Sequence, residues 1–175
     1  LVAWVGRDAF VAGVRTYFDR HAWGNTELSD LLSTLEETSG RDLSSWAKEW
    51  LETAGLNTIR ASFEVDDEGR FTSFDILQSA PEAHPTLRSH RLAIGLYEHG
   101  PEGLTKVHRV ELDVVGERTA VPELVGTAQP DLVLVNDDDL AYTKIRLDQR
   151  SAQTLVDHIG ELSDSLARTL CWTAA

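Results

Sequence analysis

The segment SSWAKEWLETAGLNTIRASFEV, residues 44–65, changes its apolar period at Gly55. Before this glycine, apolar side chains recur every three or four residues, as they do on one face of a helix. These side chains are Leu43, Trp46, Ala47, Trp50, Leu51 and Ala54. After it, apolar and polar side chains alternate, which is the pattern of a strand with one buried face. The segment therefore predicts a helix, a left-handed glycine cap at its end and then the first strand of a sheet.

Two further helices are predicted before this segment. Aromatic and apolar residues at helical spacing indicate the first, namely Phe10, Val14, Tyr17, Phe18 and His21. The second lies in NTELSDLLSTLEETSG, residues 25–40, where Asn25 or Thr26 is the expected N-cap and Gly40 the expected stop. We therefore expect residues 1–55 to be helical.

Short strands separated by turn signals, with no helix between them, fill residues 56–147. The predicted strands are 59–65, 71–78, 88–97, 106–115, 117–121, 131–136 and 142–147. DDEG, residues 66–69, is the expected turn of a hairpin between the first two strands. DLVLVN, residues 131–136, is apolar enough for a strand buried on both faces or in a sandwich core. This series is typical of an antiparallel β-sandwich and argues against a parallel sheet.

Helical spacing returns in residues 148–175, so the predicted fold class is α+β. Ala152, Leu155, Val156 and Ile159 form one apolar stripe, and Leu166, Leu170 and Trp172 form another. The apolar start LVAWV has no cap, and the last helical pattern is unfinished at residue 175. Both ends would leave apolar surface without a partner, so we expect the chain to be a piece of a larger protein.

The composition excludes two classes of partner. The chain has 175 residues, 16 Lys and Arg, 29 Asp and Glu, and a net charge of −13. This charge repels the phosphates of nucleic acids and anionic lipid surfaces alike. No run of about 18 apolar residues is present and LVAWVGRDAF lacks the features of a signal peptide, so we expect a cytoplasmic protein. The lone Cys171 sits in a helical apolar pattern and is expected to be a small buried hydrophobe.

The sequence contains no recognisable metal or nucleotide motif. H-E-x-x-H, G-x-G-x-x-G and G-x-x-x-x-G-K-[ST] are all absent. His84 and His90 are the closest histidine pair, and we expect them to be solvated rather than metal ligands. VDDEG, residues 65–69, and NDDDL, residues 136–140, do not follow the order of an EF-hand loop, so we expect solvated turns rather than calcium sites.

Trp46 and Trp50 raise the question of an aromatic ligand platform. They share a helix face with leucines and alanines, so packing is the better explanation. Leu56 is expected to contact Leu51 across a Schellman motif at Gly55. This helix end is therefore predicted to mark the boundary between two domains.

Several stretches together resemble the aminopeptidase N family of gluzincin zinc metallopeptidases, in the segment that follows the active site. They are GNT at 24–26, SDLL at 29–32, SGRDL at 39–43, WLETAGLN at 50–57 and LVLVNDDDLAYTKIRLD at 132–148. The resemblance covers essentially the whole chain. Thr53 and Asn57 depart from it, because many members have Gln and Pro at these positions.

The resemblance implies three pieces of a larger enzyme. Residues 1–55 would be the last helices of a thermolysin-like catalytic domain, 56–147 the β-sandwich, and 148–175 the first helices of a C-terminal helical domain. The full-length protein would bind zinc and hydrolyse N-terminal residues from peptides, and this chain would pack against its other domains. The family's zinc, substrate-amine and oxyanion motifs are absent here, and Tyr17 is assigned to packing. We therefore predict no catalytic, cofactor-binding or metal-binding residue in the chain, which should be inactive alone.

An alternative from another class is a self-contained binding module with no enzymatic activity. It would be a β-sandwich with helical flanks whose loops bind a protein or a carbohydrate.

Overall fold

A computed structural model describes residues 1–174 of the protein, which divide into two compact units. The first unit is Leu1–Thr53, and the second comprises the residues from Ala54 on. None of the helices in the described residues has both the length and the apolar character needed to cross a membrane.

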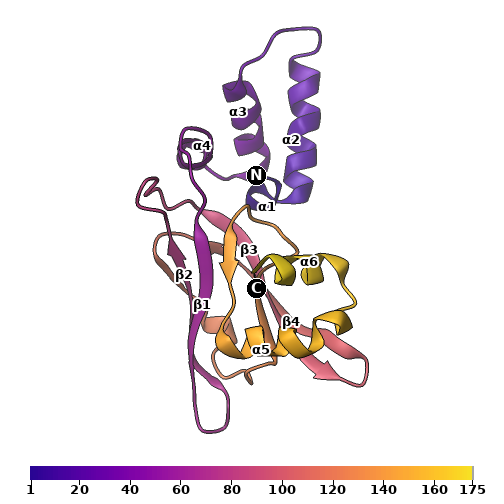
Figure 1. Cartoon of the computed structure of the whole chain (residues 1–175). Helices are drawn as coiled ribbons and strands as arrows, with labels where there is room; N and C mark the ends of the chain where they lie inside the picture. Colours follow the sequence, from indigo (N-terminus) through magenta and orange to yellow (C-terminus); the bar gives the residue numbers. More distant parts are fainter. Residues whose placement is uncertain (175) are drawn as a thin grey trace. The chain divides into compact units, whose positions relative to one another are not determined.

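The first unit is helical, as predicted. Its helices are α1 (Val2–Val5), α2 (Arg7–Arg20), α3 (Leu28–Ser39) and α4 (Ser44–Leu51) (Figure 1). The side chains of Val5, Leu35 and Leu43 form its buried centre, and Trp4, Phe10, Leu31 and Trp46 are among the side chains that pack around them.

The ends of these helices differ in part from the prediction. Gly40 closes α3 in the left-handed conformation at φ 68°, as expected. The N-cap of α3 is Glu27 rather than Asn25 or Thr26, because the Glu27 N–H donates to the Asp30 carboxylate at 2.8 Å in a capping box. Phe18, which belongs to the apolar spacing that predicted α2, is 66% exposed.

Gly55 does not cap α4, contrary to the prediction. The helix ends at Leu51, and its C-cap is Glu52 in the right-handed conformation. Gly55 has a φ of 96°, and a Cβ built on it would lie 2.5 Å from the Cβ of His84. The glycine is therefore required by a close approach of two loop segments rather than by the helix end.

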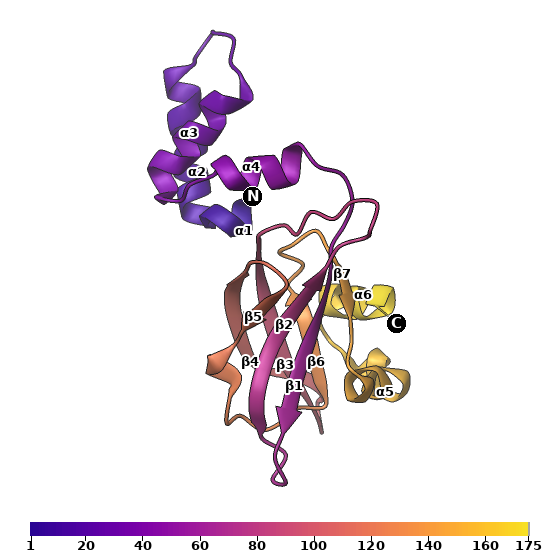
Figure 2. The same ribbon diagram turned by 90° about the vertical axis from the view of Figure 1, so that its left-hand side faces the viewer.

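Two facing sheets make up most of the second unit (Figure 2). The strands are β1 (Thr58–Val65), β2 (Phe71–Ser79), β3 (His90–Gly100), β4 (Gly103–Val114), β5 (Arg118–Ala120), β6 (Leu132–Asp137) and β7 (Lys144–Arg146). One sheet has the order β5-β2-β1-β7 and the other β4-β3-β6. The predicted hairpin is present, with Ile59 opposite Gln78 and Phe63 opposite Phe74.

One strand pair departs from the predicted antiparallel pattern. β7 runs parallel to β1, with Ile145 opposite Ile59. The chain leaves β6 in one sheet and crosses to the other through residues 138–143, so it arrives in the direction of β1. The pair is short and lies at the sheet edge.

The space between the sheets is filled by alternate residues of facing strands. Phe74 and Ile76 of one sheet meet Leu92, Ile94 and Val133 of the other in a single buried cluster. β6 is buried on both faces, as its apolar sequence indicated: Val133 and Val135 face this cluster, whereas Leu132 and Leu134 face a second one.

The second cluster joins the outer face of the three-stranded sheet to the C-terminal helices. These are α5 (Gln149–His158), the 3₁₀ turn η2 (Ile159–Glu161) and α6 (Ser165–Ala174). Leu155, Ala167 and Cys171 pack there with Tyr97 and Leu132. A second 3₁₀ turn, η1 (Pro122–Leu124), follows β5.

The predicted apolar stripes of α5 and α6 are partly wrong. Val156 is 78% exposed, and Ser151 takes a buried place on α5 instead. Trp172 and Leu166 are exposed on α6, where Ala167 and Cys171 face inward. The helices therefore contact the sheet through smaller side chains than the sequence suggested. The domain boundaries at residues 55 and 147 stay predictions, and with them the assignment of α5 and α6 to a separate helical domain.

Candidate functional site

The two tryptophans of α4 contact one another. Their rings stack with centroids 6.1 Å apart, and Trp46 also packs against the buried cluster of the first unit. Both side chains are half-buried. Trp46 therefore has the packing role that its helix face predicted.

His84 and His90 have different environments. His84 is exposed in a loop, whereas His90 is buried in β3, which corrects the expectation that both are solvated. The His90 Nε2 lies 3.3 Å from the amide oxygen of Asn57. Burial and the nearby charge of Arg88 lower the pKa of His90 to about 4, so its imidazole is neutral at pH 7.

The two acidic segments also differ. Residues 65–69 form the exposed hairpin turn that was predicted, in which an Asp66 carboxylate oxygen accepts from the N–H groups of Glu68 and Arg70. In residues 136–140, however, Asn136 and Asp137 are buried. The Asn136 side chain bonds to both the N–H and the C=O of Ala141, at 2.9 and 2.8 Å. Residues 136–140 are therefore not a solvated turn, because the first two side chains are buried inside the folded chain.

Asp137 is the centre of a polar site at the end of β6. Its carboxylate is fully buried, and it accepts a hydrogen bond from the Tyr97 hydroxyl at 2.7 Å. Its other oxygen lies 2.6 Å from the ammonium of Lys106, whose side chain is 28% exposed. Burial raises the pKa of the Tyr97 phenol, and the hydrogen bond to Asp137 raises it further, so the hydroxyl stays a donor.

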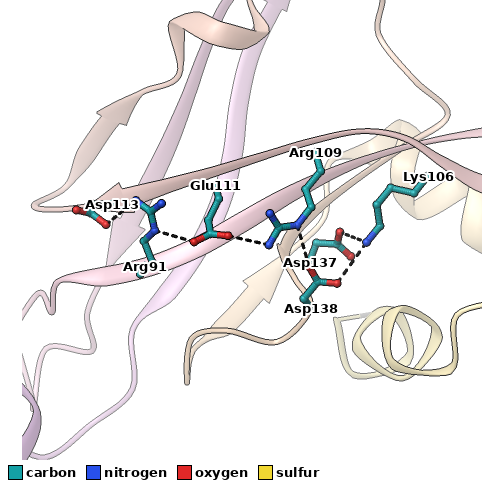
Figure 3. A network of polar contacts seen from close by, with 7 residues as sticks. All are labelled: Arg91, Lys106, Arg109, Glu111, Asp113, Asp137 and Asp138. Atoms are coloured by element: carbon teal, nitrogen blue, oxygen red, sulfur yellow. Dashed lines mark hydrogen bonds and ion pairs between the residues drawn. The ribbon is translucent and has the colours of Figure 1, made fainter. Parts of the chain in front are cut away.

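From Asp137 a chain of ion pairs extends along the outer face of the three-stranded sheet (Figure 3). Lys106 and Arg109 both contact Asp138, at 3.3 and 2.8 Å. Arg109 also contacts Glu111 at 2.9 Å, and Arg91 then bridges Glu111 and Asp113 at 2.9 and 3.0 Å. Partial burial opposes the charge of Asp138, but the hydrogen bonds from Arg109 and Lys106 outweigh it and lower the pKa of this carboxyl.

Two β-bulges bring these side chains to one face. Between Leu96 and Tyr97 the partner on β4 shifts from His108 to Lys106, so Lys106 shares a face with Arg109. A second irregularity, between Ala93 and Ile94, sets Asp137 opposite Ala93. Gly95 lies between them in β3, and a Cβ there would be 2.6 Å from the Asp137 carboxylate. The buried carboxylate therefore depends on the bulges and on one glycine.

Another cluster holds residue types that bind metals. The imidazoles of His99 and His158 each lie 2.8 Å from a carboxylate oxygen of Glu161. Hydrogen bonds with His158 and His99 lower the pKa of Glu161. The two histidines also line a pocket of about 760 Å³ that includes Asp131 and Arg150. Among residues 1–174, this is the group of three potential ligands that lie within reach of one ion.

Neither cluster was predicted from the sequence. The members of the Asp137 cluster come from β3, β4 and the end of β6, and those of the other cluster from β3, α5 and η2, with contacting partners up to 62 positions apart in the sequence. No motif with fixed spacing links such positions. One local feature could have pointed to the Asp137 cluster: Asp137 and Asp138 directly follow the predicted apolar strand, residues 131–136.

Comparison with known proteins relates the chain to aminopeptidases. Aminopeptidase N of Streptomyces lividans is 56% identical over 182 residues, which include 100% of this chain and 21% of that protein. Aminopeptidase N of Lactococcus lactis subsp. lactis is 42% identical over 64 residues, 37% of this chain and 7% of that protein. No protein-family model matches.

A solved structure supports the fold. Aminopeptidase A of Legionella pneumophila, crystallised with aspartic acid, matches 96% of this chain and 19% of its own, with a TM-score of 0.70 at 14% identity. The chain thus spans about a fifth of the length of both full-coverage matches. Because its whole length aligns at 56% identity, the chain belongs to the aminopeptidase N family, as a segment of a family member.

Proposed function

We propose that this chain is a non-catalytic part of a zinc-dependent enzyme that removes N-terminal residues from peptides. The observation that carries the proposal is the 56% identity to the Streptomyces lividans aminopeptidase N over the entire chain. The 175 residues contain no H-E-x-x-H, the zinc-binding motif of the family. They also contain no methionine, which the family's substrate-amine motif G-x-M-E-N requires. The zinc and the substrate's amine would therefore be held by residues outside this chain, whose own residues would take no part in the catalytic step.

Within the enzyme, the chain would brace the catalytic domain and position the helices that follow. Residues 1–55 would belong to the catalytic domain, 56–147 to the sandwich and 148–175 to the helical domain. The sandwich suits this role because its interior is closed by a continuous buried cluster. The exposed Leu166 and Trp172 on α6 are apolar surface of the kind that contacts further protein. We also propose that the whole enzyme is cytoplasmic and that its substrates are peptides.

The isolated chain provides the first test. It is incubated with alanyl- and leucyl-p-nitroanilide, with added zinc and with a chelator. We expect no hydrolysis above the buffer rate in either condition, whereas the intact Streptomyces lividans enzyme, as the positive control, should release nitroaniline. Zinc-dependent hydrolysis by the chain that the chelator abolishes would overturn the proposal.

A chimaera tests whether this chain can serve as part of an active aminopeptidase. Residues 1–175 replace the matching segment of the Streptomyces lividans enzyme, which is 56% identical to them. We expect the chimaera to fold and to keep aminopeptidase activity within about tenfold of the parent. A matched control replaces the same segment with a flexible Gly/Ser linker and should be inactive. A folded but inactive chimaera would favour the binding-module alternative.

A further inference from the structure

We propose that His99, His158 and Glu161 form a binding site for one divalent transition-metal ion, with zinc as the ion to test. This inference does not rest on the proposed peptidase function, because it concerns a cluster within the second unit alone. The imidazole rings of the two histidines stack with centroids 4.0 Å apart and planes 30° apart. One candidate ligand atom from each residue lies within 4.8 Å of the other two.

The donor set fits zinc better than calcium or magnesium. Two imidazole nitrogens and one carboxylate oxygen are ligands that zinc, nickel and copper accept, whereas calcium and magnesium prefer oxygen alone. Three protein ligands leave at least one coordination position for water. The partly exposed side chains, at 38%, 33% and 42%, give an ion access from solvent.

The geometry needs only a small adjustment to admit the ion. Tetrahedral zinc with bonds near 2.05 Å holds its ligand atoms about 3.3 Å apart. The His99 Nε2 lies 2.8 Å from one Glu161 oxygen, and the His158 Nδ1 lies 2.8 Å from the other. Because one ligand atom from each residue lies within 4.8 Å of the other two, side-chain rotation has to change these separations by about 1.5 Å or less. The stacked rings must also turn so that their lone pairs converge. About a third of each histidine side chain is exposed, so core packing does not enclose either ring on all sides.

The backbone on both sides of the cluster is held in place. The His99 N–H donates to Asp131 at 2.9 Å, and Asp131 pairs with Arg150 of α5 at 2.8 Å. On the other side, Leu162 forms a parallel bridge with Leu104, next to Glu161. Gly103 has a φ of 86°, and a Cβ on it would lie 2.7 Å from the Glu161 carbonyl oxygen. These contacts fix the main chain on both sides of the cluster, and the partly exposed side chains of the three residues can turn toward an ion.

Titration calorimetry of the whole 175-residue chain, without an affinity tag and after treatment with a chelator, tests the site. We expect one Zn²⁺ per chain, and Mg²⁺ at millimolar concentration should not compete. His99→Ala and His158→Ala should each weaken Zn²⁺ binding more than about tenfold, and the double variant should abolish it. His108→Ala is the matched control, because His108 is exposed on β4 outside the cluster and should leave binding unchanged.

Thermal unfolding followed by circular dichroism gives a second readout. Without metal, the variants should unfold within a few degrees of the native chain, which shows that they fold. Zn²⁺ should raise the unfolding midpoint of the native chain and of His108→Ala, but not that of the double variant. The proposal is overturned if the native chain binds no Zn²⁺, or if the folded double variant binds it as tightly as the native chain does.

Discussion

Gly95 leaves the space that the buried carboxylate of Asp137 occupies. A Cβ at this position would lie 2.6 Å from an Asp137 carboxylate oxygen and 2.7 Å from the Tyr97 ring. Both neighbours are buried, so neither can move aside into solvent. We predict that Gly95→Ala lowers the free energy of unfolding by about 1–3 kcal/mol. Gly100→Ala, in the same strand but with open space around its Cβ, should change it by less than about 0.5 kcal/mol in urea titrations. Equal effects of the two substitutions would contradict this account.

Cys171 is a residue whose burial predicts a pH dependence. Burial, and secondly the charge of Asp137, raise the pKa of its thiol to about 12. The unfolded thiol has a pKa of about 8.5, so the folded state holds the proton more tightly. The resulting stabilisation is complete below pH 8.5 and is lost as pH rises toward 12, by about 1.4 kcal/mol per pH unit in between. Urea titrations between pH 8 and 10 should show this slope as the difference between the native chain and Cys171→Ala. An identical pH dependence of the two proteins would refute it.

At the scale of elements, Ser151 joins α5 to the edge of the three-stranded sheet. Its hydroxyl accepts from the N–H of Val133 in β6 at 2.8 Å and donates to the N-cap residue Asp148. Ser151→Ala leaves a buried N–H without this partner, so we predict a loss of about 1–3 kcal/mol of stability. The Val133 amide should also exchange with deuterium faster, as measured by NMR. Ser163→Ala, at an exposed position, is the control and should alter neither quantity. Unchanged exchange at Val133 would argue against the role of Ser151.

The same helix shows what the sequence could predict and what it could not. The existence of α5 was predictable, because Asp148 accepts from the first-turn N–H groups and the apolar spacing follows. Its buried face was not, since an apolar stripe favours Val156 over Ser151, whereas Ser151 is the residue that completes the hydrogen bonding of β6. The hairpin of β1 and β2 was predictable from alternation and a local turn. The Asp137 and His99 clusters were not, because their geometry arises from bulges and from contacts between distant elements.

For the whole molecule, the buried clusters divide between the two units. The clusters of the sandwich and of its outer face contain residues from Ile59 to Ala174, and they share β3 and β6 as a common wall. The first unit has its own smaller cluster around Leu35. Because a segment of about 50 residues buries little apolar surface, its independent stability is marginal, whereas the larger unit carries enough core to fold cooperatively.

We therefore predict that residues 54–175 fold without the first unit. Their urea unfolding, followed by circular dichroism, should be a single cooperative transition, and residues 1–53 alone should show little or none. The control is residues 54–137, which keep six strands but lack β7, α5 and α6. This shorter piece should lose the cooperative transition, because Leu132 and Leu134 would be uncovered on the outer face of the sheet and Ile59 would lose its edge strand. If residues 54–175 unfolded without a transition while the full chain showed one, the first unit would be required for the sandwich to fold. A cooperative transition of residues 54–137 would instead show that the sandwich folds without β7, α5 and α6.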